Sequence, residues 1–375
     1  MRHDTYAAES IWIEFAGNSC CEPSSQHLKE HISGKTLLIT GAGGSIGSAL
    51  ARFADTCDVQ CLVLLDSNEQ SLRTLERSFD SSSKKSHVSV LGNICDSVWL
   101  CEVFALYLPL VILHAAASKH VPLMELNPLA AASNNVLGTH FLLQAAAEYG
   151  TEQLIMVSTD KAVLPVSVMG ATKRLAELLL LTHPERALQR KSVRLGNVLG
   201  SSGSVGPLFL KQIMEGGPVT VTHPDARRYF LTLDHAVTLL LTALSSQYES
   251  GILIPDLGRP KTVEELARYL IAARPSEQRN IEIIYTGLRP GDKCEELLWS
   301  SHESVFAMDD NLLSIVRPNR LPQNLQAIVE QITLSVRQRD LRLLLESICK
   351  AVPEYCPGPV LLQIIENKNQ LETLK

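Results

Sequence analysis

Residues 40–47 read Thr40-Gly41-Ala42-Gly43-Gly44-Ser45-Ile46-Gly47, and this stretch decides the fold. An apolar run precedes it and a helical pattern follows it. The glycines at 41, 44 and 47 permit a tight turn, close approach of the backbone to a pyrophosphate, and close packing of the helix on the strand. The N-terminus of the helix adds N–H donors and the positive end of a dipole. The stretch predicts the phosphate-binding turn of a Rossmann-type fold that holds a nicotinamide dinucleotide.

Strand and helix patterns alternate from residue 35 to residue 195. Strands are expected at residues 35–40, 60–66, 87–91, 110–114, 153–158 and 192–195, and helices at 45–56, 69–80, 98–107, 128–149 and 169–181. This alternation predicts an α/β fold with a doubly wound parallel sheet and right-handed crossovers. Beyond residue 200 the alternation loosens, with helices expected at 207–215, 234–245 and 262–273 and strands at 219–221, 252–255 and 281–285.

These patterns divide the chain into four parts. An irregular N-terminal extension is expected at residues 1–33, with a linker at 20–25, followed by an NAD-binding Rossmann domain at 34–200. A smaller C-terminal substrate-binding lobe is expected at 201–358, with some segments returning to the main sheet, and a tail at 359–375. The region after about Pro322 is expected to be helical, with Pro353 and Pro357 as breakers.

Composition limits the partners of the 375-residue chain. A net charge of −6, from 34 basic and 40 acidic residues, argues against a nucleic-acid surface or an anionic membrane. The nine cysteines form no C-x-x-C pair and no Cys/His set with zinc spacing, so no metal is expected. The sequence has no signal-peptide pattern, and its most apolar stretch, residues 103–113, is too short for a membrane span. We expect a soluble, cytoplasmic homo-oligomer.

Asp66 closes the second expected strand, about 25 residues after Gly41. A carboxylate at this place accepts hydrogen bonds from the adenosine ribose and repels a 2′-phosphate, which favours NAD over NADP. A surface aspartate at a strand end would have no such role. The strand, the turn, the helix and the acidic residue together indicate the cofactor site.

A second polar cluster follows the fifth expected strand. It begins with Thr159, Asp160 and Lys161, and a helix one loop later carries Met169 and Lys173, which a spacing of four places on one face. Each of these residues alone could equally belong to a helix cap or be a charge exposed to solvent. Their combination after a parallel strand favours a catalytic site.

The sequence resembles the extended short-chain dehydrogenase/reductase family, and within it the membrane-type (CapD-like) UDP-N-acetylglucosamine 4,6-dehydratases of polysaccharide biosynthesis. In that branch methionine replaces the tyrosine of the Tyr-x-x-x-Lys motif, as Met169 does here. The similarity covers about residues 20–358 and is carried by residues 34–47, 114–125, 134–139, 158–173, 193–201, 220–230, 287–291 and 352–355. The family's membrane helices are missing from this sequence, which looks like the catalytic part standing alone.

The resemblance implies a closed redox cycle on a UDP-sugar. NAD takes a hydride from C4, water is eliminated across C5 and C6, and the hydride returns to C6. Asp160 would be the general acid for the C6 hydroxyl, Lys161 the base at C5 with a lowered pKa, and Lys173 the residue that holds the ribose. Because Met169 cannot take a proton, the C4 proton would go to Asp160, to Thr159 through a relay, or to water.

Two sets of binding residues follow from the motifs. The predicted cofactor contacts are Gly41, Gly43, Gly44, Ser45, Ile46, Gly47, Asp66, Asn93, Ile94, Ala115, Ala116 and Lys173. The predicted substrate contacts are Lys119, His120, Glu125, Asn197, Arg228 and Arg289, with the two arginines suited to a diphosphate.

Some positions depart from the family pattern, and rival functions stay open. Asn93 stands where an aspartate usually meets the adenine, and residues 292–296 are one residue short. C4 epimerisation and C5-inverting dehydration are alternatives on the same scaffold, although the Thr-Asp-Lys segment favours elimination. A catalytically silent NAD-sensing protein is a rival of another class, and retention of Asp160, Lys161 and Lys173 argues against it.

Overall fold

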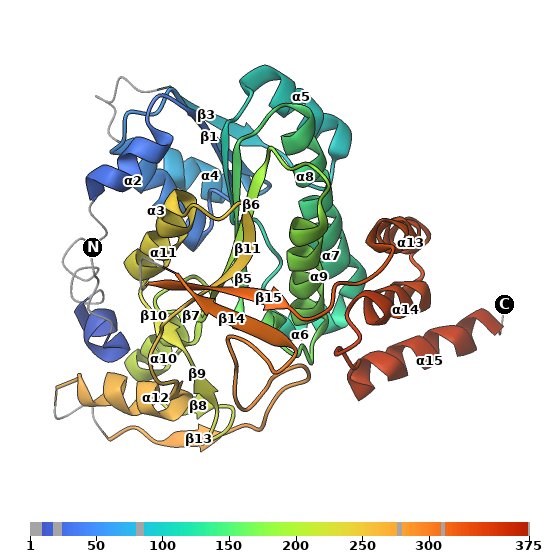
Figure 1. Ribbon diagram of the computed structural model, residues 1–375. Coiled ribbons are helices and arrows are strands. Elements are labelled where there is room, and N and C mark those ends of the chain that lie inside the picture. The colour runs from blue at the N-terminus through green and yellow to red at the C-terminus, as the bar shows by residue number, and fades with distance from the viewer. Residues whose placement is uncertain (1–9, 18–24, 80–85, 276–279, 309–311, 374–375) are drawn as a thin grey trace.

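The predicted alternation of strands and helices forms one central sheet in a computed structural model, which describes residues 10–17, 25–79, 86–275, 280–308 and 312–373 (Figure 1). Within these residues the sheet has nine strands in the order β14-β15-β11-β6-β5-β4-β1-β2-β3. The strands are β1 (Thr36–Thr40), β2 (Cys61–Asp66), β3 (His87–Leu91), β4 (Val111–His114), β5 (Gln153–Thr159), β6 (Gln189–Leu195), β11 (Ser250–Pro255), β14 (Glu303–Ala307) and β15 (Leu313–Pro318). β15 runs antiparallel to its two neighbours, β11 and β14, and every other neighbouring pair in this sheet is parallel, so the predicted Rossmann-type fold is confirmed.

The side chains of β1 alternate between two hydrophobic layers. Leu37 and Ile39 face one cluster and Leu38 faces the other, as expected for a strand buried on both sides. The first cluster lies under α2 (Ser25–Ile32), α3 (Ser45–Asp55), α4 (Glu69–Glu76) and α11 (Leu233–Ser245). The second lies under α5 (Ser97–Tyr107), α8 (Thr139–Glu148), α9 (Val168–Thr182), α13 (Leu325–Gln338) and α14 (Leu341–Ala351). In Figure 1 these two groups of helices stand on opposite sides of the sheet.

A smaller lobe lies below the carboxyl ends of the strands in Figure 1. It contains α10 (Val205–Met214), α12 (Val263–Ala272) and three two-stranded sheets. These pair β7 (Asn197–Val198) with β10 (Phe230–Leu231), β8 (Val219–Val221) with β13 (Ile283–Tyr285), and β9 (Arg227–Arg228) with β12 (Lys261–Thr262). The lobe has its own apolar cluster, which includes Phe209 and Leu266.

The expectation of an irregular N-terminal extension is wrong. Residues 10–16 are helical, and α2 precedes the first strand. Trp12, Phe15 and Ala16 are buried in the cluster of the smaller lobe, because their spacing of three and four places them on one helical face. Residues 20–24 of the predicted linker and the loop predicted at 81–85 lie outside the described residues.

The single long helix expected at residues 128–149 is also wrong. The segment consists of α7 (Pro128–Ala132), a π-helical turn η1 (Ser133–Gly138) and α8, and the short α6 (Val121–Leu126) precedes it. Within this turn the Asn135 side chain accepts a hydrogen bond from the backbone N–H of Ser118 at 2.8 Å and donates to its carbonyl at 3.0 Å. These bonds join the turn to a loop 17 residues earlier in the chain.

The antiparallel hairpin of β14 and β15 was not predicted. It adds an edge to the sheet next to β11, while α13 and α14 return to cover α7 and α9. The C-terminal region is helical as expected, ending in α15 (Pro359–Thr373). Segments after residue 200 therefore return to the main sheet, whereas the proposed domain boundaries stay predictions.

Candidate active site

The glycine-rich turn has the geometry that its sequence predicts. Gly41 has φ of +67°, and a Cβ there would lie 2.6 Å from the backbone nitrogen of Ala116. A Cβ on Gly47 would collide with the carbonyl oxygen of Gly41, so only glycine lets α3 approach β1 this closely. Asp66 stabilises the turn, because its carboxylate accepts hydrogen bonds from the N–H of Gly43 and of Asn68, both at 2.8 Å.

A pocket of about 260 Å³ opens at this turn. Of the predicted cofactor residues it is lined by Gly41, Gly44, Asp66, Asn93, Ile94, Ala115 and Ala116. The turn glycines leave space that a side chain would fill, and an acidic residue lies at the end of β2. These features fit a dinucleotide, with the phosphates at the N-terminus of α3. The side-chain oxygen of Asn93 accepts a hydrogen bond from the N–H of Cys95 at 3.0 Å, so it already has a partner within the loop.

A loop of the smaller lobe closes over the turn. The hydroxyl of Ser45 accepts a hydrogen bond from the N–H of Ser202 at 2.9 Å, and Lys119 Nζ donates to the carbonyl of Ser202 at 2.7 Å. A Cβ on Gly203 would lie 2.5 Å from the ring of His120, which leaves no room for another side chain there. The structure thus brings three predicted binding residues together at one loop.

The predicted catalytic residues lie where β5 ends: Thr159 is its last residue, and Asp160 and Lys161 follow in the short 3-10 turn η2 (Asp160–Ala162). Asp160 is fully buried, and its Oδ1 accepts hydrogen bonds from the Thr159 hydroxyl and from Lys161 Nζ, both at 2.9 Å. Lys161 Nζ also donates to the side-chain oxygen of Asn197 at 3.1 Å. Within the described part of the chain, Asp160 Oδ2 is buried without a hydrogen-bond partner. This oxygen is available to a proton or to a ligand.

The expectation of a lowered pKa for Lys161 is wrong. Burial favours the neutral amine, but the carboxylates of Asp160 and Glu296 outweigh burial and raise the pKa of Lys161 above its ordinary value. The Glu296 carboxylate lies 3.9 Å from Lys161 Nζ. The prediction failed because the sequence does not show that a second carboxylate reaches the lysine.

The pKa of Lys173, in contrast to that of Lys161, is lowered. Lys173 is buried on α9, and burial lowers its pKa to about 8, opposed in part by Glu177. Its Nζ donates a hydrogen bond to the carbonyl of Val157 on β5 at 2.7 Å. Met169, four residues earlier, is buried among apolar side chains. The helix therefore offers one cation and no proton acceptor at these two positions.

Three predicted substrate residues are engaged within the protein. Glu125 is buried and accepts a hydrogen bond from the N–H of Val168 at 2.6 Å, so it supports the start of α9. The buried Arg228 guanidinium donates to the carbonyls of Arg227, Lys293 and Cys294. The Arg289 side chain is exposed and pairs with Asp292 at 2.8 Å. In this structure the Arg228 guanidinium is occupied by backbone carbonyls rather than free to bind a diphosphate, and the Glu125 carboxylate is occupied by the backbone of α9.

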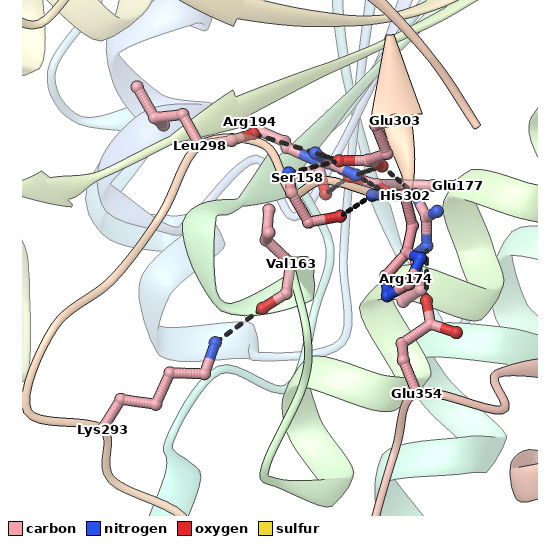
Figure 2. Close-up of polar contacts among 11 residues, drawn as sticks. Ser158, Val163, Arg174, Glu177, Arg194, Lys293, Leu298, His302, Glu303 and Glu354 are labelled. Carbon is pink, nitrogen blue, oxygen red and sulfur yellow. Dashed lines mark hydrogen bonds and ion pairs between the residues drawn. The ribbon is translucent and has the colours of Figure 1, made fainter. Parts of the chain in front are cut away.

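A network of buried ion pairs lies next to β5, the strand that ends at the predicted catalytic residues (Figure 2). Arg194 at the end of β6 pairs with Glu177 of α9 at 2.9 Å and with Glu303 of β14 at 2.8 Å. Glu177 also accepts a hydrogen bond from the Ser158 hydroxyl at 2.6 Å, and Arg174 joins Glu177 to Glu354. The network thus fastens the hairpin and the C-terminal region to the strand and helix that carry the predicted catalytic residues.

Sequence reasoning missed Glu296. It belongs to residues 292–296, which stood out only because they are one residue shorter than the family pattern. The structure buries this glutamate against Lys161. In the sequence alone, two adjacent glutamates followed by an apolar residue do not indicate that either glutamate is buried.

The residues that the structure describes contain neither a cluster of metal ligands nor a helix that could span a membrane. No group of three or more His, Cys, Asp or Glu side chains there has the arrangement of a metal site. No helix in the same residues has the length and apolar character needed to cross a bilayer.

A family described as "Polysaccharide biosynthesis protein" matches residues 37–317. The chain is 40% identical over 280 residues to the capsular polysaccharide biosynthesis protein CapD of Staphylococcus aureus, and 41% identical over 283 residues to the probable polysaccharide biosynthesis protein EpsC of Bacillus subtilis. Each match covers 74% of this chain and 47% of the relative, so the chain spans about half the length of these curated relatives. A UDP-glucose 4-epimerase of Rickettsia massiliae is 34% identical, with 73% of this chain and 80% of the relative covered.

Solved structures share the fold. Pen from Bacillus thuringiensis superposes with a TM-score of 0.70 at 25% identity, covering 81% of this chain and 98% of that one. A dTDP-glucose 4,6-dehydratase from Streptomyces venezuelae, with NAD and DAU bound, gives a TM-score of 0.58 at 22% identity over 69% of this chain and 86% of that one.

Proposed function

The chain belongs to the polysaccharide biosynthesis protein family, as a CapD-like extended short-chain dehydrogenase/reductase, and on that premise we propose that it is an NAD-dependent nucleotide-sugar 4,6-dehydratase. The proposed substrate is UDP-N-acetylglucosamine or a close UDP-sugar, and the product is the 4-keto-6-deoxy sugar. NAD is favoured over NADP by Asp66 at the rim of the pocket. A cytoplasmic homo-oligomer remains our expectation from the sequence.

One observation carries the proposal. A buried carboxyl group, that of Asp160, and an amine on a side chain that is 22% exposed, that of Lys161, lie 2.9 Å apart at the carboxyl end of β5, and the tyrosine of the common oxidoreductase motif is replaced by Met169. This edge of a parallel sheet is where α/β proteins bind ligands. An acid and a base side by side suit an elimination, in which one proton is removed and another is added.

NAD, when bound, supplies the acceptor for the C4 hydride and the donor that returns it to C6. A ketone at C4 makes the C5 proton acidic, and Lys161 takes this proton when its amine is neutral; the raised pKa of Lys161 makes this form the minor one but a stronger base. The C5–H electron pair forms the C5–C6 double bond while the C6–O bond breaks. Asp160 gives its proton to the departing oxygen, which leaves as water. Its unpartnered Oδ2 is the atom we assign to this proton. When the hydride is returned to C6, the Lys161 ammonium gives a proton back to C5, which completes the 4-keto-6-deoxy sugar.

The C4 hydroxyl proton needs another acceptor because the Met169 thioether takes none. The Thr159 hydroxyl, which is hydrogen-bonded to Asp160 at 2.9 Å, provides a relay to that carboxylate. Lys173 would hold the nicotinamide ribose, as its place on α9 in the family motif implies.

Substitution Asp160→Asn tests the proposal. We expect kcat to fall by about 100-fold or more, since the amide cannot donate the proton, while the bound NAD content stays unchanged. The matched control is Asp225→Asn, whose side chain is exposed in the smaller lobe and should leave kcat unchanged. Full turnover by the Asp160→Asn variant would contradict the assigned role.

C4 epimerisation is the second candidate, because the Rickettsia relative is named a UDP-glucose 4-epimerase. An epimerase would return the hydride to C4 and leave the C5 and C6 bonds intact. Product analysis separates the two reactions directly, since only the dehydratase forms a 6-deoxy sugar.

A further inference from the structure

The segment at residues 293–298 is held at both ends. At its start, the Arg228 guanidinium donates to the carbonyl of Lys293 at 2.8 Å, and Lys293 Nζ donates to the carbonyl of Val163 at 2.6 Å. At its end, Arg194 donates to the carbonyl of Leu298 at 2.9 Å. Figure 2 shows the Lys293–Val163 and Arg194–Leu298 contacts on either side of the catalytic turn. The middle of the segment, which contains Glu296, is therefore fixed in place.

Glu296 is buried beside Lys161. Its Oε1 lies 3.9 Å from Lys161 Nζ, and its Oε2 lies 3.2 Å from Lys293 Nζ. Lys161 Nζ contacts Asp160 on its other side at 2.9 Å. The amine thus stands between two buried carboxylates that come from different parts of the chain.

Other groups around Lys161 do not supply the same charge. Arg228 is a cation and opposes protonation of Lys161, and Asn197 is neutral. Thr159 and Tyr229 are neutral at ordinary pH. Burial, together with the charges of Glu295 and Asp160, raises the pKa of the Tyr229 phenol above its ordinary value. Lys293 lies behind Glu296 and partly neutralises it. Among the described residues that act on Lys161, the negative charges are those of Asp160 and Glu296.

We propose that Glu296 is a positioning residue of the active site, which together with Asp160 holds the Lys161 ammonium and so assists proton transfer to Lys161. The reaction step rests on the proposed function, because it takes Lys161 as the base at C5. The proton that leaves C5 becomes an ammonium proton on Lys161. A second carboxylate at 3.9 Å stabilises that ammonium.

The direct test measures the protonation of Lys161 without substrate. Trace acetylation by acetic anhydride over a range of pH, read by mass spectrometry on the peptide that contains Lys161, gives its apparent pKa. In Glu296→Gln we expect this pKa to fall by about one unit, because one of two stabilising charges is lost. Glu295→Gln is the matched control, since this neighbouring glutamate is exposed and should leave the value unchanged. An unchanged Lys161 pKa in folded Glu296→Gln would overturn the proposal.

Two further measurements keep the test decisive. Glu296→Asp retains the charge on a shorter side chain, so its Lys161 pKa should fall less than that of Glu296→Gln, and a larger fall would contradict the proposal. The acid limb of the kcat–pH profile should move to lower pH by the same amount as the labelling pKa, because a base with a lower pKa is neutral at lower pH. A shift in labelling without turnover on any UDP-sugar would refute the proposed function and leave the charge coupling standing.

Discussion

Gly47 shows how a single position controls the cofactor site. Its missing side chain lets α3 start directly against the carbonyl of Gly41, and this contact sets the turn that faces the pocket. We predict that Gly47→Ala lowers the NAD content of the purified protein at least tenfold, because the turn must move away from the strand. Cofactor released by denaturation and counted per chain measures this. Ser48→Ala, one residue further along the same helix, should retain its NAD, and retention by both variants would contradict the account.

Met169 offers a second residue-scale test. The side chain is buried among apolar neighbours, and we assign it no chemical role. Met169→Leu nearly conserves volume, so we expect a stability loss below about 1.5 kcal/mol and a kcat within about threefold of the parent. Steady-state kinetics with a melting curve check this. A 100-fold loss of kcat in a folded variant would show that the thioether takes part in the reaction.

At the scale of elements, the ion network joins β5, β6, α9 and β14 through Glu177. Glu177→Gln leaves a buried guanidinium with one fewer carboxylate, and we expect a loss of about 3–5 kcal/mol in the free energy of unfolding. The matched control Glu346→Gln breaks an exposed pair with Arg342 and should change stability by less than about 1 kcal/mol. Urea denaturation at neutral pH measures both. Equal effects would contradict a structural role for the network.

The same network predicts a dependence on pH. Burial alone would raise the pKa of Glu177, but Arg194 and Arg174 outweigh burial and lower it below its ordinary 4.5. A lowered folded-state pKa means that the stabilisation is present above the unfolded value and is lost as pH falls through the folded value. The stability gap between the parent and Glu177→Gln should therefore shrink below about pH 4.5. A gap that is constant with pH would show that the charge of Glu177 is not its source.

The elements also show what could be predicted from the sequence. The parallel strands were predictable because each is an apolar run between turn residues, and the glycine turn because its steric needs leave few alternatives. The π-helical turn at Asn135, the buried position of Glu296 and the engagement of Arg228 were not predictable. Each involves contacts with residues distant in the chain, namely Ser118, Lys161 and the carbonyls of Lys293 and Cys294. The local sequence pattern determines where a strand or helix forms, whereas contacts between distant residues determine the burial and the hydrogen-bond partners of a polar side chain.

At the scale of the whole molecule, the N-terminal helix at residues 10–16 packs into the apolar cluster of the smaller lobe. Trp12 packs where side chains on Gly200 and Gly206 would stand, on either side of the loop that contacts Ser45 and Lys119. We predict that Trp12→Ala lowers stability by about 3–5 kcal/mol and weakens NAD retention, since the loop loses its support. Trp299→Ala, at a position 48% exposed, should leave both nearly unchanged. Unfolding curves measure the stability of both variants, and the NAD content of the purified proteins measures retention. Unchanged NAD retention in Trp12→Ala would contradict a role of this helix in supporting the cofactor site.

In the proposed reaction the cofactor takes one hydride from C4 of the sugar and returns it to C6 of the same sugar, with water eliminated in between. The most direct measurement is NMR of UDP-N-acetylglucosamine incubated with the purified chain in D₂O. The account predicts a UDP-4-keto-6-deoxy sugar with deuterium at C5 and no net formation of NADH. A C4-epimerised sugar with its C5 proton and C6 hydroxyl retained would contradict it.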